Sequence, residues 1–178
     1  MTLDRIDTAR AARVIDTLRD RRSASRFNAE SVSREAVDGL IEAARWAPNH
    51  HLTEPWRFFV LTGDARVALG EAIAAEVLAG AEPDSKATAE ATGVRTKVLR
   101  SPVIVIVAQS RAQSAATPEV DLEDYAACCC ATQNLLLAAQ SAGLAAKWST
   151  GKMAHSAAAN RFLGLEPEDR IVAYVYLG

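Results

Sequence analysis

The apolar positions of the chain predict several short strands separated by helices. Residues 103–107 read Val-Ile-Val-Ile-Val, an uninterrupted β-branched run of the kind found in a strand covered on both faces. We therefore expect this strand at the centre of a sheet. Residues 58–61 and 171–177 are also rich in strand formers, and 144–149 is a shorter candidate strand.

Apolar residues at helical spacing predict six helices, three of them with clear end signals. Ser33 stands at an N-cap position and Pro48 prevents continuation of the same helix. Gly143 and Gly164 follow two later helices as natural terminating residues. The expected ranges are 7–20, Ser33 to before Pro48, 64–78, 85–99, 121–142 and 156–163.

Three of these helices carry further expectations. The 64–78 helix should direct Val67, Ile73 and Val77 inward. The 85–99 segment is polar and alanine-rich, so it gives little facing information and is equally compatible with a mobile segment. The alanine-rich 121–142 helix suits close packing, either against the sheet of its own chain or at a subunit interface. Residues 79–84 and 109–118 read as loops.

The order of elements favours an α+β fold, with a central mixed or antiparallel sheet of about four strands flanked by helices. Two helices follow one another between the strands at 58–61 and 103–107, which breaks the βαβ rhythm of a doubly wound sheet. No Gly-x-Gly-x-x-Gly motif, Walker loop or internal repeat is found. We expect residues 1–178 to form a single domain.

Composition narrows the classes of protein. The 178 residues are 49% apolar and 24% charged with a net charge of −2, which fits one soluble domain and argues against a nucleic-acid binder. No apolar run approaches the roughly 18 residues that span a bilayer, and the first residues lack the apolar core of a signal peptide, so we expect a cytoplasmic protein.

The cysteines predict no metal site. Cys128, Cys129 and Cys130 are consecutive, so on a helix they point about 100° apart and cannot jointly hold one ion. We interpret them as reduced thiols of the core.

The segment Arg21-Arg22-Ser23-Ala24-Ser25-Arg26 is the first candidate for binding chemistry. Arginine offers a rigid fork of donors and serine a small adaptable hydroxyl, a combination suited to gripping a phosphate group. The alternative is a solvated basic helix end, because cations near a helix C-terminus complement its dipole without any ligand.

Taken together, the motifs resemble those of one known family. They are the arginine-serine cluster after the first helix, Ala-Pro-Asn-His before Pro-Trp-x-Phe-Phe-Val, a Ser-Pro-led aliphatic strand, Lys-Trp-Ser-Thr-Gly, and a terminal Tyr-Leu-Gly. In this order and over nearly the whole chain, they resemble the nitroreductase family of FMN flavoproteins, in particular its small bacterial members. The resemblance implies a homodimer with two FMN sites at the interface, reduced by NADH or NADPH and reoxidised by nitroaromatics, quinones or related acceptors.

The resemblance also implies roles for individual residues. Arg21, Arg22 and Ser23 match the family's phosphate and ribityl contacts, and Ser25 and Trp46 occupy further cofactor positions. The turn at Asn49 and His50 matches the one that reaches the flavin of the other subunit, with His50 the best candidate for touching substrate. Trp148, Ser149, Thr150 and Gly151 match the segment alongside the isoalloxazine ring. Without the resemblance, Trp148 would read as a core aromatic, Ser149 as an exposed hydroxyl and His50 as a surface histidine.

The chain departs from the family pattern in ways that concern charge. Some relatives have arginine at the positions of Trp46 and Ser149, and larger relatives have lysine at Ser25. Fewer cations near the flavin should lower its reduction potential unless Arg26 or Lys147 compensates. The sequence ends at Gly178, where relatives continue into a C-terminal arm that often adds a phosphate-binding cation, so we expect a shortened member or a missing tail.

The leading hypothesis is therefore an FMN-dependent NAD(P)H oxidoreductase with a ping-pong mechanism. The alternative is a protein of the same fold that binds FMN, or has lost it, without appreciable turnover. A nucleic-acid module built on Arg21 to Arg26 is disfavoured, because no aromatic residues are interleaved with the basic run.

Overall fold

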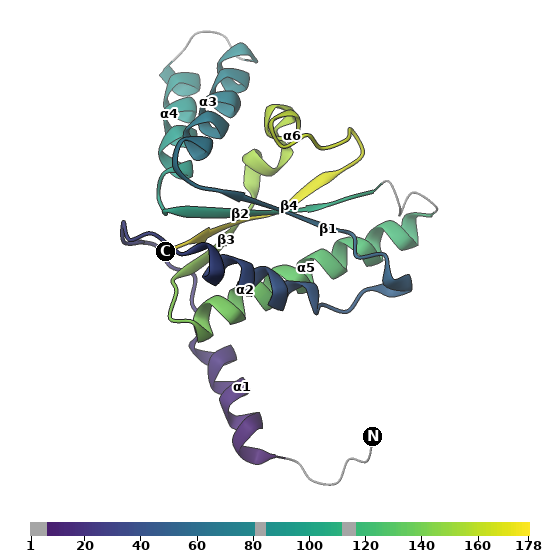
Figure 1. Ribbon diagram of the computed structural model, residues 1–178. Helices are drawn as coiled ribbons and strands as arrows, with labels where there is room; N and C mark the ends of the chain where they lie inside the picture. The colour runs from purple at the N-terminus through teal and green to yellow at the C-terminus, as the bar shows by residue number, and fades with distance from the viewer. Residues whose placement is uncertain (1–6, 81–84, 112–116) are drawn as a thin grey trace.

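A four-stranded antiparallel sheet forms the middle layer of the protein (Figure 1). The computed structural model describes residues 7–80, 85–111 and 117–178. The strand order is β1-β2-β4-β3. The strands are β1 Trp56–Leu61, β2 Val103–Gln109, β3 Ala146–Ser149 and β4 Arg170–Leu177.

Helices cover both faces of this sheet (Figure 1). One face packs against α2 and the long α5, and the other against α3, α4 and α6. In the described part of the chain the helices are α1 Thr8–Asp20, α2 Arg34–Arg45, α3 Gly63–Ala79, α4 Ser85–Val98, α5 Pro118–Ser141 and α6 Ala157–Leu163. Two short 3₁₀ turns, η1 His50–Leu52 and η2 Gly151–His155, complete the elements. The α+β class and the predicted sheet are confirmed.

Strand β2 is the centre of the core, as its β-branched run predicted. All seven of its residues are buried. Val103, Val105 and Val107 belong to the cluster under α2 and α5, whereas Ile104 and Ile106 belong to the cluster under α3 and α6. The alternation follows from the two-residue period of a strand, which sends successive side chains to opposite faces.

Helix α3, the first of the two helices between β1 and β2, differs from its predicted facing. Ile73 is buried and Val77 is half-buried, but Val67 is exposed, so its inward placement was wrong. The buried stripe of α3 instead runs through Leu69, Gly70, Ile73 and Ala74. Gly70 explains the difference, because a Cβ at this position would lie 2.6 Å from Val98 of α4. The stripe therefore faces a second helix as well as the sheet.

Helix α4 is ordered against α3 and is not a free segment. Its buried residues Ala87, Ala91, Val94 and Val98 lie three to four positions apart along one face. Small side chains on that face let the two helices approach closely. Part of the predicted 79–84 loop, and part of the predicted 109–118 loop, lie outside the described residues.

Helix α5 begins three residues earlier than predicted and carries the cysteines in three different environments. Thr117 caps it and Pro118 takes the first helical position, where a missing N–H has no consequence. Cys128 is buried, Cys129 half-buried and Cys130 exposed, so the interpretation as core thiols holds in full only for Cys128. Burial raises the pKa of the Cys128 thiol to about 12. This thiol is therefore a packing group and not a nucleophile.

Helix α1 projects away from the three layers (Figure 1). Asp7 caps it through a hydrogen bond to the N–H of Arg10, but none of its residues is buried. Val14, Ile15 and Leu18 form an apolar stripe that remains exposed.

The described residues contain neither a membrane-spanning helix nor a cluster of metal-ligating side chains. No helix there is long and apolar enough to cross a membrane. No group of three or more histidine, cysteine or acidic side chains in these ranges is placed to hold a metal ion.

Candidate functional site

The arginine-serine segment is held next to β3. Ser23 forms a parallel bridge with Ala146, and the N–H of Ala24 donates to the Ala146 carbonyl at 3.0 Å. Two candidate binding segments, 21–25 and 148–151, are therefore joined through the first residue of β3. Ser23, which forms this bridge, and Ser25, two residues further along, are both exposed.

The two adjacent arginines have different surroundings. Arg22 folds back onto the end of α1, where its Nη1 donates to the carbonyl of Arg19 and, at 3.0 Å, to that of Arg21. Arg22 therefore fits the alternative interpretation of a basic helix end, because it donates to carbonyls that have no hydrogen-bond partner within the helix. The half-buried side chain of Arg21 makes no hydrogen bond or ion pair with the described residues. Arg21 is therefore the guanidinium available to an anion.

The second segment leaves β3 at an open turn. Trp148 is half-buried against the core and donates from Nε1 to the Val172 carbonyl at 3.3 Å. Ser149 is half-buried and Thr150 exposed. Gly151 has φ +76° with no neighbouring atom within 4 Å of where a Cβ would be. The space beside Gly151 is therefore open, so another molecule can approach its backbone closely.

A strained turn presents the Asn49-His50 pair. His51, Leu52 and Glu54 all have positive φ, which is uncommon for residues other than glycine. Asn49 contributes to the turn internally, since its Oδ1 accepts from the N–H of Glu54 at 3.0 Å. His50 stacks on the His51 ring, with ring centroids 3.8 Å apart.

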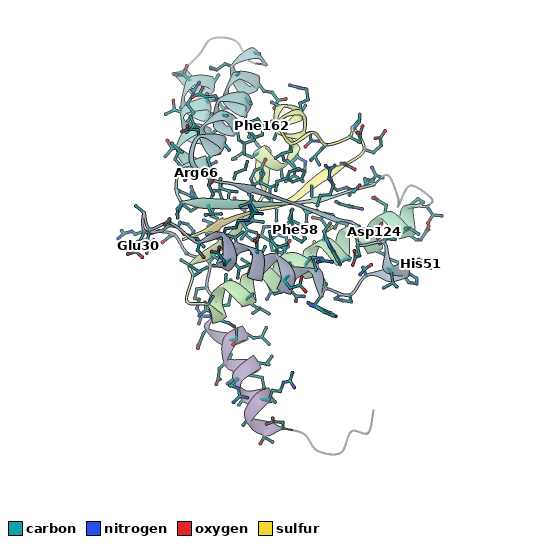
Figure 2. All side chains as sticks on the ribbon, viewed as in Figure 1. Glu30, His51, Phe58, Arg66, Asp124 and Phe162 are labelled. Atoms are coloured by element: carbon teal, nitrogen blue, oxygen red, sulfur yellow. The ribbon has the colours of Figure 1, made fainter. Side chains whose placement is uncertain are left out.

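Two consecutive acids of α5 hold this turn. Glu123 Oε2 lies 2.7 Å from Nδ1 of His50, and Asp124 Oδ1 accepts from the Thr53 hydroxyl at 2.7 Å. Asp124 is only 1% exposed, and its Oδ2 has no hydrogen-bond partner among the described residues. In Figure 2, Asp124 and His51 lie at the same end of the molecule. The turn is thereby attached to the first turns of α5.

Trp46 lies at the end of α2, three residues before the Asn49-His50 turn. Trp46 is 79% exposed at the end of α2, and its Nε1 donates to Glu42 at 3.1 Å. This placement gives it no contact with Arg21 or Gly151 within one chain.

A single chain does not bring all the predicted site residues together. The arginine segment joins Ala146 near the C-terminal end of α5, whereas the Asn49-His50 turn contacts Glu123 near its N-terminal end. The helical rise separates Glu123 from Ala142 by about 28 Å along the axis. The candidate residues therefore form two groups on one chain.

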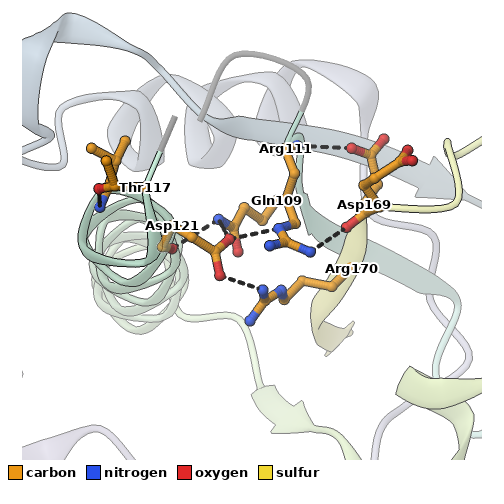
Figure 3. A network of polar contacts seen from close by, with 8 residues as sticks. Gln109, Arg111, Thr117, Asp121, Asp169 and Arg170 are labelled. Carbon is orange, nitrogen blue, oxygen red and sulfur yellow. Dashed lines mark hydrogen bonds and ion pairs between the residues drawn. The ribbon is translucent and has the colours of Figure 1, made fainter. Parts of the chain in front are cut away.

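A polar network fixes the end of α5 that carries Glu123 and Asp124 (Figure 3). Asp121 accepts from Arg111 Nε and from Arg170 Nη2, each at 2.6 Å, and from Gln109 Nε2 at 3.0 Å. Partial burial alone would raise the pKa of Asp121, but Arg170 and Arg111 outweigh it and hold this pKa below its ordinary value. The network ties the helix to both β2 and β4.

Sequence reasoning missed Glu123, Asp124 and Thr53. The two acids occur early in a helix, where acidic residues are expected simply because they complement the helix dipole. Their partners lie more than 70 positions away in the sequence, so spacing gives no signal of the pairing. A three-dimensional structure was needed to find them.

The chain matches a known family over most of its length. The family model described as "Nitroreductase family" matches residues 18–178. The chain belongs to this family, and the resemblance noted in the sequence is confirmed.

Individual relatives agree with the assignment. The chain is 29% identical to the Escherichia coli (strain K12) protein named "Putative NAD(P)H nitroreductase YdjA" over 164 residues, which is 92% of this chain and 86% of that protein. The structure of the "Nitroreductase-like Family Protein from Bacillus cereus" has a TM-score of 0.81 at 25% identity, covering 93% of this chain and 84% of the other. A "putative nitroreductase in complex with fmn" from Desulfovibrio desulfuricans has a TM-score of 0.70 at 30% identity, with the same coverage.

The first prediction concerns the Asp121 network. A carboxyl whose pKa is lowered by folding stabilises the protein above its ordinary pKa of 3.8, and this contribution is lost as the pH falls through the folded-state value. Asp121→Asn should therefore lower the free energy of unfolding by about 1–3 kcal/mol at pH 7. The deficit should shrink below about pH 4. Urea unfolding at pH 7, 5 and 3.5 measures it.

Asp38→Asn provides the matched control, since Asp38 pairs with Arg34 on the exposed surface of α2. Such a pair contributes little to stability. Equal losses for the two variants, or a loss at Asp121 that does not depend on pH, would contradict the role assigned to the network.

Proposed function

We propose that this member of the family is an FMN-dependent NAD(P)H oxidoreductase that delivers electrons to nitroaromatics, quinones or similar small acceptors by a ping-pong mechanism. The observation that carries the proposal is Arg21, a half-buried guanidinium without a partner among the described residues, placed beside the segment that leads to Gly151. NADH and NADPH both remain candidates for the reductant.

The residues present fit the phosphate end of FMN. Arg21 is free to form charge-assisted hydrogen bonds to phosphate oxygens, and the exposed hydroxyl of Ser23 lies two positions away. Arg22 is already bonded to carbonyls of α1, so we assign it to shaping the segment. Ser25 adds a second hydroxyl. In this proposal only Arg21 of the pair faces the phosphate.

The residues also fit the ring end. We assign Trp148, Ser149, Thr150 and Gly151 to the isoalloxazine, because the turn at Gly151 leaves open space for the close approach that a planar ring needs. FMN, when bound, would supply the redox chemistry by accepting a hydride from NAD(P)H and passing electrons to the acceptor. The protein residues bind it, orient it and limit the access of water.

We further propose that the active protein is a homodimer with FMN sites at the interface. The arginine group and the Asn49-His50 turn lie toward opposite ends of α5 in one chain, so a site using both needs two chains. The exposed apolar stripe of α1, together with exposed Leu122 on α5, offers surface for such an interface. Trp46 and His50 would then reach the partner's cofactor, with His50 touching the acceptor.

The direct test of the function is optical. Protein purified with FMN should be yellow, and anaerobic addition of NADH or NADPH should bleach the flavin absorbance, which a nitroaromatic or quinone then restores. Flavin that is bound but not reduced by either nicotinamide would instead support the alternative of a binding protein without turnover. The same titration, run with each nicotinamide, identifies the preferred reductant.

The second test concerns the phosphate contact. Arg21→Ala should weaken FMN binding by about tenfold to a hundredfold, because one charge-assisted contact is lost. The fold should be unchanged, since this residue lies outside the core. Flavin fluorescence gives the dissociation constants. Arg22→Ala is the matched control and should have a smaller effect on FMN binding. Equal FMN affinities for wild type and Arg21→Ala would mean that the cluster is a solvated helix end and does not bind the phosphate.

The third test concerns assembly. Sedimentation equilibrium should find the mass of a stable dimer. We expect its interface to bury more than about 2,000 Å² in total, as is typical of obligate assemblies. Leu18→Glu, which places a charge on the exposed stripe of α1, should shift the protein toward monomer and reduce flavin content together. A monomer that retains its flavin would refute the shared site.

A further inference from the structure

We propose that Glu123 is a positioning residue for His50: its carboxylate keeps a proton on Nδ1 of the imidazole and leaves Nε2 as the atom offered to the electron acceptor. The inference rests on the proposed function, in which His50 touches the acceptor. It adds a residue outside the segments that the sequence singled out.

The contact itself fixes the ring's proton. Nδ1 of His50 and Oε2 of Glu123 are 2.7 Å apart, within the range of a charge-assisted hydrogen bond. An ionised carboxylate can only accept, so the ring nitrogen facing it must donate. A neutral imidazole has one N–H, and Nε2 is then left as an acceptor.

The neighbouring ring of His51 restricts rotation of the His50 ring. His51 stacks on it with an interplanar angle of 18°, so rotation of either ring would break the stack. His50 and Glu123 also line a surface hollow of about 420 Å³ with Pro48, Ala126 and Cys130. The imidazole is therefore both oriented and accessible from this hollow.

Glu123 and its neighbour Asp124 differ in burial, and this difference indicates different roles. Asp124 is nearly inaccessible and holds Thr53, so it carries the attachment of the turn to α5. The side chains of His50 and Glu123 are 59% and 47% exposed. An exposed pair of this kind contributes little to the stability of the fold. Its main effect is therefore on which nitrogen of the His50 ring carries the proton.

The decisive experiment reads the tautomer directly. Two-bond proton-nitrogen correlation of the ¹⁵N-labelled protein reports which ring nitrogen of His50 is protonated, and with three histidines in the chain the spectrum is readily assigned. At pH 8 we expect the Nδ1–H form in wild type and a shift toward the Nε2–H form in Glu123→Ala. Glu123→Gln, whose side-chain carbonyl can still accept, should retain most of the Nδ1–H form.

The kinetic arm tests the consequence for turnover. Anaerobic stopped-flow measurements should show that Glu123→Ala slows reoxidation by a quinone or nitroaromatic by about tenfold or more, as expected when a contacting group is misplaced. FMN affinity and reduction by NAD(P)H should stay within about twofold. Glu119→Ala, on the same helix but without contact to His50, should behave as wild type.

A double-mutant comparison separates positioning from direct action. In a His50→Ala background, Glu123→Ala should cause no further slowing, because its effect passes through the ring. Full additivity, or an unchanged tautomer in Glu123→Ala, would overturn the proposal. The tautomer measurement needs neither flavin nor turnover, so a protein that proves unable to bind FMN would refute the proposed function and still decide the role of Glu123.

Discussion

The constraint on which the fold depends is the burial of β2 on both of its faces. Its valines face α5 and its isoleucines face α3 and α6, so neither side of the sheet can be left to solvent. A chain of this length meets the requirement with one helical layer on each side. The long α5 spans its face, and the two groups of candidate site residues lie toward the two ends of that helix.

Most of the fold could be predicted from local patterns because the patterns agree with the tertiary structure. The β-branched run of β2, the Ser33 cap of α2 and the left-handed Gly164 after α6 were all read correctly from sequence. The facing of α3 could not be read, because Gly70 lets α4 pack where a side chain would otherwise point. Contacts of this kind depend on a residue distant in the sequence, here Val98, so local spacing in α3 does not reveal them.

The candidate site was predictable in part, through its distinctive chemistry. The arginine-serine cluster stands out as a group of anion-binding donors, whereas the turn at Gly151 was singled out only by the resemblance to the family. Their function is inferred from the resemblance to the family. Glu123 and Asp124 could not be distinguished in the sequence, since both look like ordinary acids at a helix start. Only their depths in the structure, one half-exposed and one inaccessible, separate them.

The left-handed residues of the 49–54 turn have a consequence for how the protein opens. Each non-glycine residue in this region costs about 1–2 kcal/mol, so His51, Leu52 and Glu54 together oppose much of what the hydrogen bonds of the turn contribute. The turn therefore opens at a small fraction of the free energy needed to unfold the sheet. Its amides should exchange with solvent through local fluctuations, while those of β2 exchange only through global unfolding. The turn that carries His50 is thus expected to open more easily than the sheet beside it.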